Sequence, residues 1–278
     1  MRGKTIVITG ATSGIGEVAA IRLAEQGARI VFTARDKVRA AATMEKLRRA
    51  NGAVEHAVHL ADLSLLAEMK RVAGEIAEEP EIDVLINNAG AVFNARRETR
   101  DGLEQTFALN HMSYFVIANL LLPKLKPGAR IVSTASGAHR RATLDFDDLQ
   151  SRRGYSGFAV YARSKLCNIL FTRELARRIA GSGVTANCLH PGFVATRFGD
   201  QSGGLLAIGV WAAKRLTAIS EEAGAKTLIY LAALPNVAQV NGAYFYECKI
   251  DMPSPAARDD RAAKRLWDIS AEISGTGQ

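Results

Sequence analysis

The tyrosine and lysine of Tyr161-Ala162-Arg163-Ser164-Lys165 have the types and spacing that proton transfer needs. On a helix, residues at i and i+4 share one face, so the Lys165 ammonium can approach the Tyr161 phenol. A nearby cation favours the ionised phenol, and we expect it to lower the Tyr161 pKa from about 10 toward working pH. Such a phenol can protonate a carbonyl oxygen or deprotonate an alcohol. This pattern also arises by chance, so its meaning depends on the surrounding elements.

The chain after Tyr161 has the periodicity of a helix. Apolar residues recur there at intervals of roughly three to five, and no glycine or proline occurs before Gly181. The residues of this apolar face are Leu166, Ile169, Leu170, Leu175 and Ile179. The sequence therefore predicts a helix that holds Tyr161 and Lys165 side by side.

The composition is that of an ordinary globular protein. Of 278 residues, 48% are hydrophobic and 23% charged, which excludes a disordered or collagen-like chain. Residues 1–278 are predicted to form a single domain, since α/β proteins often reach this size as one unit. The three cysteines, Cys167, Cys188 and Cys248, are widely spaced and indicate neither a disulfide framework nor a metal site. With no signal-peptide pattern at residues 1–9, we expect a cytoplasmic protein.

The net charge of +8 raises the question of nucleic-acid binding. Basic residues are interleaved with acids, as in residues 258–261, and no basic stripe occurs, so no nucleic-acid partner is predicted. The charge instead favours an anionic small molecule. The longest apolar stretch, residues 203–213, is too short for a bilayer span of about 20 residues, which predicts no membrane span. Whether residues 204–219 touch a membrane surface is left open.

A glycine-rich turn follows the first predicted strand, residues 5–9. Apolar residues at helical spacing follow this glycine-rich turn. The order is therefore strand, glycine turn and helix, which is the order that a dinucleotide site requires. Glycines let the backbone approach a pyrophosphate, whose charge the helix N-terminus stabilises. The alternative is a plain strand-to-helix turn. The residues predicted to bind the cofactor here are Gly10, Thr12, Ser13, Gly14, Ile15 and Gly16.

The end of the second predicted strand, residues 28–34, indicates which dinucleotide binds. NAD-binding folds place an acid at this point for the ribose 2′-hydroxyl, whereas this chain has Ala34 and then Arg35. A guanidinium suits the 2′-phosphate of NADP, so NADP is the predicted cofactor. Asp36 lies too late for the acidic role and is expected to cap the next helix. The alternative for Arg35 is a solvated surface charge.

The glycine spacing, together with Asn87-Asn88-Ala89-Gly90 after a predicted strand at residues 83–86, resembles the short-chain dehydrogenase/reductase family. The long gap between Ser136 and Tyr161, with Ala138-His139 after the serine, is similar to the retinol-dehydrogenase-like branch of that family. Segments 222–225, 242–245 and 254–259 also resemble this branch.

The resemblance implies a catalytic set of Asn110, Ser136, Tyr161 and Lys165. Ser136 follows a predicted strand, residues 130–136, and ligands of open sheets bind at the carboxyl ends of strands, so its hydroxyl can donate to a substrate carbonyl. Asn110 lies within a single helix predicted over residues 103–122; family members use this asparagine to hold a water in the proton path. The alternative for Ser136 is a serine that only forms a turn, and the alternative for Asn110 is an amide with a purely structural role. His139 is interpreted as a polar loop residue rather than a catalytic base.

Further cofactor contacts are implied by the same resemblance. Asp62-Leu63 matches a pair that lies against the adenine, although Asp62 could equally be an N-cap. The small residues of Asn87-Asn88-Ala89-Gly90, after the predicted strand at residues 83–86, allow the nucleotide to approach closely. The alternative for this tetrapeptide is an Asx turn. The contacts implied beyond Asp62 and Leu63 are Asn88, Ala89, Gly90, Tyr161, Lys165, Pro191, Gly192, Val194 and Thr196.

The segment after this last group, residues 197–219, is predicted to form a lid over the substrate. Its apolar residues suggest an apolar substrate, although ordinary helix packing would explain them nearly as well. A homo-oligomer is possible, and the sequence does not specify one.

Alternating strands and helices predict one α/β domain of Rossmann type: a doubly wound, mainly parallel, seven-stranded sheet with helices on both faces. The predicted function is NADP-dependent interconversion of a carbonyl and an alcohol on a small molecule. One alternative is an NADP-binding sensor or scaffold without turnover. Another is reduction of a C=C or imine bond by the same fold.

Overall fold

A computed structural model describes residues 1–192 and 220–277. The predicted lid at residues 197–219 and the predicted cofactor contacts Val194 and Thr196 lie outside these residues.

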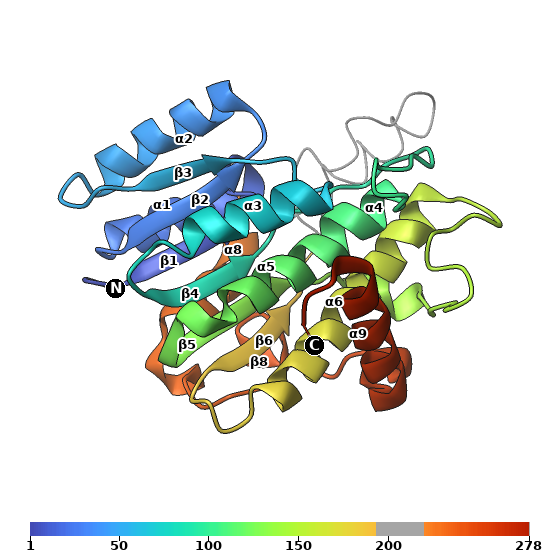
Figure 1. The fold of residues 1–278 in the computed structure, drawn as a ribbon. Helices are drawn as coiled ribbons and strands as arrows, with labels where there is room; N and C mark the ends of the chain where they lie inside the picture. The colour runs from blue at the N-terminus through green and yellow to red at the C-terminus, as the bar shows by residue number, and fades with distance from the viewer. Residues whose placement is uncertain (193–219, 278) are drawn as a thin grey trace.

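One sheet organises the described part of the chain (Figure 1). Its strand order is β3-β2-β1-β4-β5-β6-β7-β8, and every pair is parallel except β7 with β8. The bounds are β1 (Thr5–Thr9), β2 (Arg29–Ala34), β3 (Ala57–Leu60), β4 (Ile82–Asn87), β5 (Leu125–Thr134), β6 (Thr185–Leu189), β7 (Tyr244–Tyr246) and β8 (Lys249–Ile250). The doubly wound, mainly parallel fold is confirmed. The predicted seven strands are extended by β8, whose two residues are too few for a sequence pattern to reveal.

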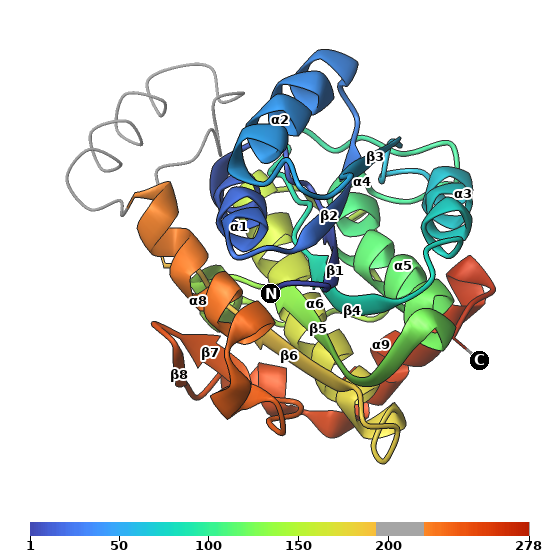
Figure 2. The ribbon, with the colours of Figure 1, turned by 90° about the vertical axis from the view of Figure 1, so that its left-hand side faces the viewer.

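Helices cover both faces of the sheet, as Figure 2 shows. On one side lie α1 (Gly14–Glu25), α2 (Lys37–Ala50) and α8 (Glu221–Ala233). On the other lie α3 (Leu66–Ile76), α5 (Ser113–Leu121) and α6 (Gly157–Arg178), with α9 (Asp260–Ser274) packed on α6. Short 3-10 turns occupy Leu122–Lys124, Gly137–Arg141, Pro235–Val237 and Pro255–Arg258.

The alternation of side chains along β1 explains why both faces are covered. Ile6 and Ile8 pack into the core beneath α1, α2 and α8, whereas Val7 between them packs into the core beneath α3, α5 and α6. All three are fully buried. Successive strand residues point to opposite faces, so a strand that is apolar throughout requires a helical layer on each side.

The single helix predicted over residues 103–122 is interrupted. A short turn, α4 (Gln105–Phe107), leads into a π-helical segment (Ala108–Met112) before α5 begins. Asn110 lies in the middle of this π segment. A π turn inserts one residue per turn and frequently marks a functional site, and hydrophobic periodicity alone does not distinguish it from α-helix.

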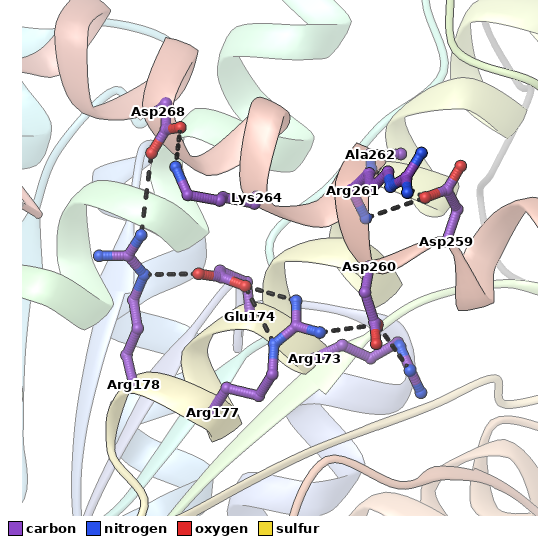
Figure 3. Close-up of polar contacts among 10 residues, drawn as sticks. All are labelled: Arg173, Glu174, Arg177, Arg178, Asp259, Asp260, Arg261, Ala262, Lys264 and Asp268. Atoms are coloured by element: carbon purple, nitrogen blue, oxygen red, sulfur yellow. Dashed lines mark hydrogen bonds and ion pairs between the residues drawn. The ribbon is translucent and has the colours of Figure 1, made fainter.

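The C-terminal helix α9 is fixed to α6, the helix that carries Tyr161 and Lys165, by both apolar and charged contacts. The Trp267 ring packs on Phe115 and Phe171, at centroid distances of 4.9 and 5.9 Å. A network of ion pairs then joins the two helices (Figure 3). The nearly buried carboxylate of Glu174 accepts from Arg177 and Arg178, and the more exposed Asp260 binds both Arg177 and Arg173.

The two acids of this network should contribute unequally to stability. Glu174→Gln leaves two arginines without their shared, desolvated carboxylate, and we expect it to lower the free energy of unfolding by about 1–3 kcal/mol. Asp260→Asn removes a largely exposed acid, for which about 0–1 kcal/mol is expected. Urea denaturation of both variants checks this. Equal losses would show that burial does not determine the strength of this network.

Candidate functional site

The predicted site residues converge because three adjacent strands end together. β1 pairs with β4 and β4 with β5, all in parallel, so their carboxyl ends lie at one edge of the sheet. The chain leaves these strands at Gly10, Asn88 and Ala135, and the glycine turn, the Asn-Ala-Gly turn and Ser136 therefore meet there.

The glycine turn packs too closely against its neighbours to tolerate other residues. Gly10 has a φ of +70°, and a Cβ added to it would lie 2.7 Å from the Ala89 Cα. A Cβ on Gly16 would lie 2.3 Å from both the Gly10 carbonyl oxygen and the Asn88 side-chain nitrogen. These glycines are required by close packing of α1 against the ends of β1 and β4, which exceeds what a plain strand-to-helix turn needs.

The N-terminus of α1 has the properties of an anion site. Ser13 stands at its N-cap without a side-chain cap hydrogen bond, as does Ser156 at the N-cap of α6, whereas the caps of α2, α8 and α9 each accept backbone N–H groups. The first N–H groups of a helix have no partner within the helix and carry a partial positive charge. The site therefore fits a dinucleotide pyrophosphate, which would take the place of a side-chain cap.

Two arginines lie at the end of β2. Arg35 is exposed directly after the strand, and Arg39, one helical turn later, donates to the Thr12 carbonyl oxygen at 3.3 Å. The Asp36 carboxylate accepts the Arg39 backbone N–H at 2.8 Å, which confirms its predicted capping role. Sequence reasoning missed Arg39, although its i+4 spacing from Arg35 was a usable signal.

Asp62 does not cap the helix that follows it. Asp62 accepts the backbone N–H and the hydroxyl of Ser64, at 3.0 and 2.7 Å, whereas the N-cap of α3 is Leu65. The N-cap interpretation is therefore wrong: Asp62 closes a turn one step before the helix begins. Leu63 is buried in the core beneath α3 and α5. Their adenine contact stays a prediction.

Asn88 joins three strand ends. Its amide nitrogen donates to the carbonyls of Thr9 and Gly10, and its oxygen accepts from the Thr134 hydroxyl. Next to it, a Cβ on Gly90 would lie 3.2 Å from the Asn110 oxygen and 3.4 Å from the Lys165 ammonium nitrogen. The small residue at position 90 thus allows the β4 end to approach Asn110 and Lys165.

Asn110 has every polar atom of its side chain occupied. Its oxygen accepts the Ala91 N–H at 2.9 Å, and its nitrogen donates to the Ala91 carbonyl and to the Ser164 hydroxyl, at 2.9 and 3.0 Å. Ser164 in turn donates to the Tyr161 carbonyl. Asn110 thus connects the turn after β4 to the helix that carries Tyr161. Its predicted role in holding a water stays a prediction.

The structure brings Ser136 and Tyr161 together. Ser136 follows β5 and accepts the Ala138 N–H on its hydroxyl, while Tyr161 is buried near the start of α6. A hydrogen bond between the two side chains lowers the Tyr161 pKa, but burial has the larger, opposite effect and raises it to about 12. Ser133 lies within β5, as expected, and is fully buried.

Lys165 projects toward the same strand end and is nearly inaccessible to solvent. Its ammonium donates to the Thr134 carbonyl at 3.0 Å and lies 5.7 Å from the centre of the Tyr161 ring. Burial lowers its pKa to about 7. The expectation that Lys165 lowers the Tyr161 pKa is therefore wrong for this structure: the spacing is right, but burial disfavours charge on both groups.

Pro191 and Gly192 follow β6 beside Ser136. The Gly192 N–H donates to Nδ1 of His190, whose ring stacks on Tyr246 at 4.0 Å. A Cβ on Gly137 would lie 3.7 Å from the same Nδ1, so this turn borders the turn after Ser136. The predicted nicotinamide contact of Pro191 and Gly192 stays a prediction.

Tyr155 and His139 lie between Ser136 and Tyr161 in the sequence, and the side chains of both bind backbone carbonyl groups. Tyr155, which lacks a lysine at i+4, has a structural role: its hydroxyl donates to the Phe93 carbonyl at 2.8 Å. His139 lies in a short turn after Ser136, as the loop interpretation requires, and it is fully buried there. The sequence around it is polar, and only the fold reveals the C-terminal segment that covers it.

In residues 1–192 and 220–277, no helix is both long and apolar enough to cross a membrane. The same residues include no cluster of three or more histidine, cysteine or acidic side chains arranged to hold a metal ion. The expectations of a cytoplasmic location and a possible homo-oligomer stay predictions.

A doubly wound sheet with an uncapped glycine turn, and with serine, tyrosine and lysine gathered at its carboxyl edge, defines a class: oxidoreductases that bind a nicotinamide dinucleotide. Comparison with known families is consistent with this, because the short chain dehydrogenase family matches residues 4–203. The chain belongs to the short-chain dehydrogenase family.

Curated relatives identify the branch. The chain is 41% identical to retinol dehydrogenase 14 of Homo sapiens, covering 99% of this chain and 87% of the relative. It is 40% identical to retinol dehydrogenase 13 of the same organism, covering 98% and 85%. The predicted resemblance to the retinol-dehydrogenase-like branch is thereby confirmed.

Solved structures agree on the fold. An uncharacterized protein from Mycobacterium paratuberculosis matches with a TM-score of 0.80 and 32% identity, covering 99% of this chain and 94% of the other. A short chain dehydrogenase from Burkholderia cenocepacia, solved in complex with NADP, matches with a TM-score of 0.71 and 26% identity, covering 88% and 96%.

The burial of Lys165 should be visible in the pH dependence of stability. Its pKa is about 7 in the folded chain and 10.5 as the ordinary value, so between these pH values unfolding takes up a proton. Stability from this group therefore rises with pH across that window. In Lys165→Met this rise is lost, and the melting temperature of the variant, relative to wild type, should be highest near pH 7 and fall toward pH 9.

Thermal melts followed by circular dichroism at several pH values measure this difference. Lys46→Met is the matched control, because Lys46 is exposed and its ion pair with Glu17 is at the surface. Parallel pH profiles for wild type and Lys165→Met would contradict the lowered pKa of the buried Lys165.

Proposed function

We propose that this protein is an NADP-dependent oxidoreductase that interconverts a carbonyl and an alcohol on an apolar small molecule. The observation that carries the proposal is the hydrogen-bonded pair of Ser136 and Tyr161, with Lys165 one helical turn away, beside the uncapped N-terminus of α1. The dinucleotide, when bound, supplies or accepts the hydride.

The protonation states suit reduction of a carbonyl. With a pKa raised to about 12, the Tyr161 phenol keeps its proton at neutral pH and can donate it to a carbonyl oxygen as negative charge develops there. The Ser136 hydroxyl accepts the Ala138 N–H and hydrogen-bonds to Tyr161 in this structure; its proton can turn to the same oxygen when a substrate is bound. Two donors directed at one oxygen stabilise the transition state more than the ground state.

Lys165 and Asn110 fix the geometry of this pair. Lys165 binds the end of β5, two residues before Ser136, and Asn110 reaches α6 through Ser164. The Lys165 bond holds α6 against the strand end that carries Ser136, and the Asn110 bonds hold α6 against the turn after β4. Placement of Tyr161 and Ser136 relative to a substrate therefore depends on buried contacts rather than on mobile surface groups.

Arg35 and Arg39 support NADP over NAD. Both guanidinium groups are exposed where the second strand ends, and the nearby acid, Asp36, already accepts a helix N–H. A 2′-phosphate would meet two cations there, whereas the nearby acid for a ribose hydroxyl is engaged in capping α2. The similar Burkholderia cenocepacia protein was solved with NADP, which agrees with this choice.

An apolar substrate is supported by the relatives, which are retinol dehydrogenases. The segment between Ser136 and Tyr161 is also partly apolar. Its side chains Leu144, Phe146 and Leu149 pack, partly buried, against the core next to α6.

Tyr161→Phe should reduce the rate of carbonyl reduction by about 10²–10⁴-fold, because the general acid is lost. Tyr155→Phe is the matched control, since it removes a hydroxyl whose partners, the Phe93 carbonyl, Glu104 and Thr106, are not site residues, and it should stay active. The measurement is NADPH oxidation with a panel of apolar aldehydes and ketones, with product analysis. Full activity in Tyr161→Phe would contradict the acid role.

The same assay separates the alternatives. A wild type that binds NADPH without turnover on any member of the panel would support a sensor or scaffold. A saturated product that retains its carbonyl, or an amine, would indicate reduction of a C=C or imine bond.

Arg35→Ala should raise the KM for NADPH by roughly tenfold or more, the equivalent of one charge-assisted hydrogen bond, and leave the KM for NADH nearly unchanged. Steady-state kinetics with both cofactors measure this. Arg49→Ala, on the last turn of α2, is the control for a general loss of charge. Equal effects of Arg35→Ala on NADPH and NADH would contradict the 2′-phosphate role.

A further inference from the structure

His139 lies between the catalytic serine and the C-terminal part of the chain. It belongs to the 3-10 turn after Ser136 and is fully buried. Nδ1 lies 2.7 Å from the Ser136 carbonyl oxygen, and Nε2 lies 3.2 Å from the backbone nitrogen of Ser254.

These two partners assign the tautomer. A carbonyl oxygen can only accept a hydrogen bond, so Nδ1 carries the proton; a backbone N–H can only donate, so Nε2 has its lone pair free. The ring is therefore neutral, and neither nitrogen is available for proton transfer to a substrate. This excludes His139 as the catalytic base and leaves it as a group that holds two backbone segments.

We propose that His139 is a positioning residue that orients Ser136 for catalysis by binding its carbonyl and anchoring it to the C-terminal segment at Ser254. This rests on the proposed function of Ser136 as a hydrogen-bond donor to the substrate. The Ser136 hydroxyl accepts the Ala138 N–H, so both ends of the serine are held within one turn. Rotation of the peptide after Ser136 would break both bonds.

The surroundings keep the ring in place and uncharged. Tyr244 of β7 packs edge-on against it with ring centroids 5.2 Å apart, and the Arg140–Asp251 ion pair closes the outer side at 2.7 Å. His190, after β6, stacks on the same Tyr244. Burial lowers the His139 pKa, with Arg140 acting in the same direction and Asp251 against it. The neutral form is thus the one the fold accommodates.

Two isosteric variants separate the two bonds. In His139→Asn, the amide nitrogen can take the place of Nδ1 and keep the bond to Ser136. In His139→Gln, the amide oxygen can take the place of Nε2 and keep the bond from Ser254. The side-chain donor to the Ser136 carbonyl is lost, and only the backbone N–H of residue 139, at 3.2 Å in this structure, still binds that oxygen.

We expect kcat for carbonyl reduction to stay within about threefold of wild type in His139→Asn. In His139→Gln it should fall by roughly tenfold to 100-fold, as small misplacements of catalytic groups do, with the KM for NADPH unchanged. His56 provides matched controls, because it is also a buried histidine bound to two backbone groups, those of Ile30 and Asn51. His56→Asn and His56→Gln should lower stability and leave kcat per folded molecule unchanged.

A second readout does not depend on activity. Hydrogen exchange of the Ala138 amide, whose N–H binds the Ser136 hydroxyl, should accelerate in His139→Gln and stay slow in His139→Asn. Equal kcat and equal Ala138 exchange in the two variants would overturn the inference. If the wild type reduced no carbonyl, the proposed function would fail, and the exchange difference would still decide whether His139 holds Ser136.

Discussion

The carbonyl oxygen of Thr134 is the point on which the site depends. Three donors from two helices, the Lys165 ammonium, the Asn168 amide and the Tyr114 hydroxyl, converge on it at the end of β5. A carbonyl has two lone pairs, and such crowding persists only where the donors are buried and have no water to bind instead. Because Ser136 follows two residues later, these bonds fix the strand end relative to the helix that carries Tyr161.

Burial determines the electrostatics of this region more than pairing does. Tyr161 and Lys165 lie close enough to interact, but loss of solvent raises the pKa of Tyr161 to about 12 and lowers that of Lys165 to about 7. Among residues 1–192 and 220–277 no carboxylate pairs with Lys165, and burying such a lysine costs stability, which burying an apolar residue would not. A protein can retain such a buried lysine where the side chain has a functional role, since residues of functional sites often lower the stability of the fold.

Much of the fold and site was predictable because strand ends in parallel sheets must meet. The glycine turn, the strand order and the positions of Ser136, Asn110, Tyr161 and Lys165 follow from local patterns placed on that topology. Sequence patterns could not show burial, which reversed the expected Tyr161 pKa, nor the π turn around Asn110. Nor could they show the backbone partners of His139, because Ser254 is distant in sequence and no local pattern links the two.

The connection from His139 to Ser254 has a consequence for biosynthesis. A growing chain emerges N-terminal end first, and its early β-α units can pair before the rest is made. The serine turn, however, acquires its final restraint only when Ser254 arrives, and α6 is covered only when α9 has been translated. The glycine turn can therefore form during translation, while the turn that carries Ser136 is anchored to the C-terminal segment only in the completed polypeptide.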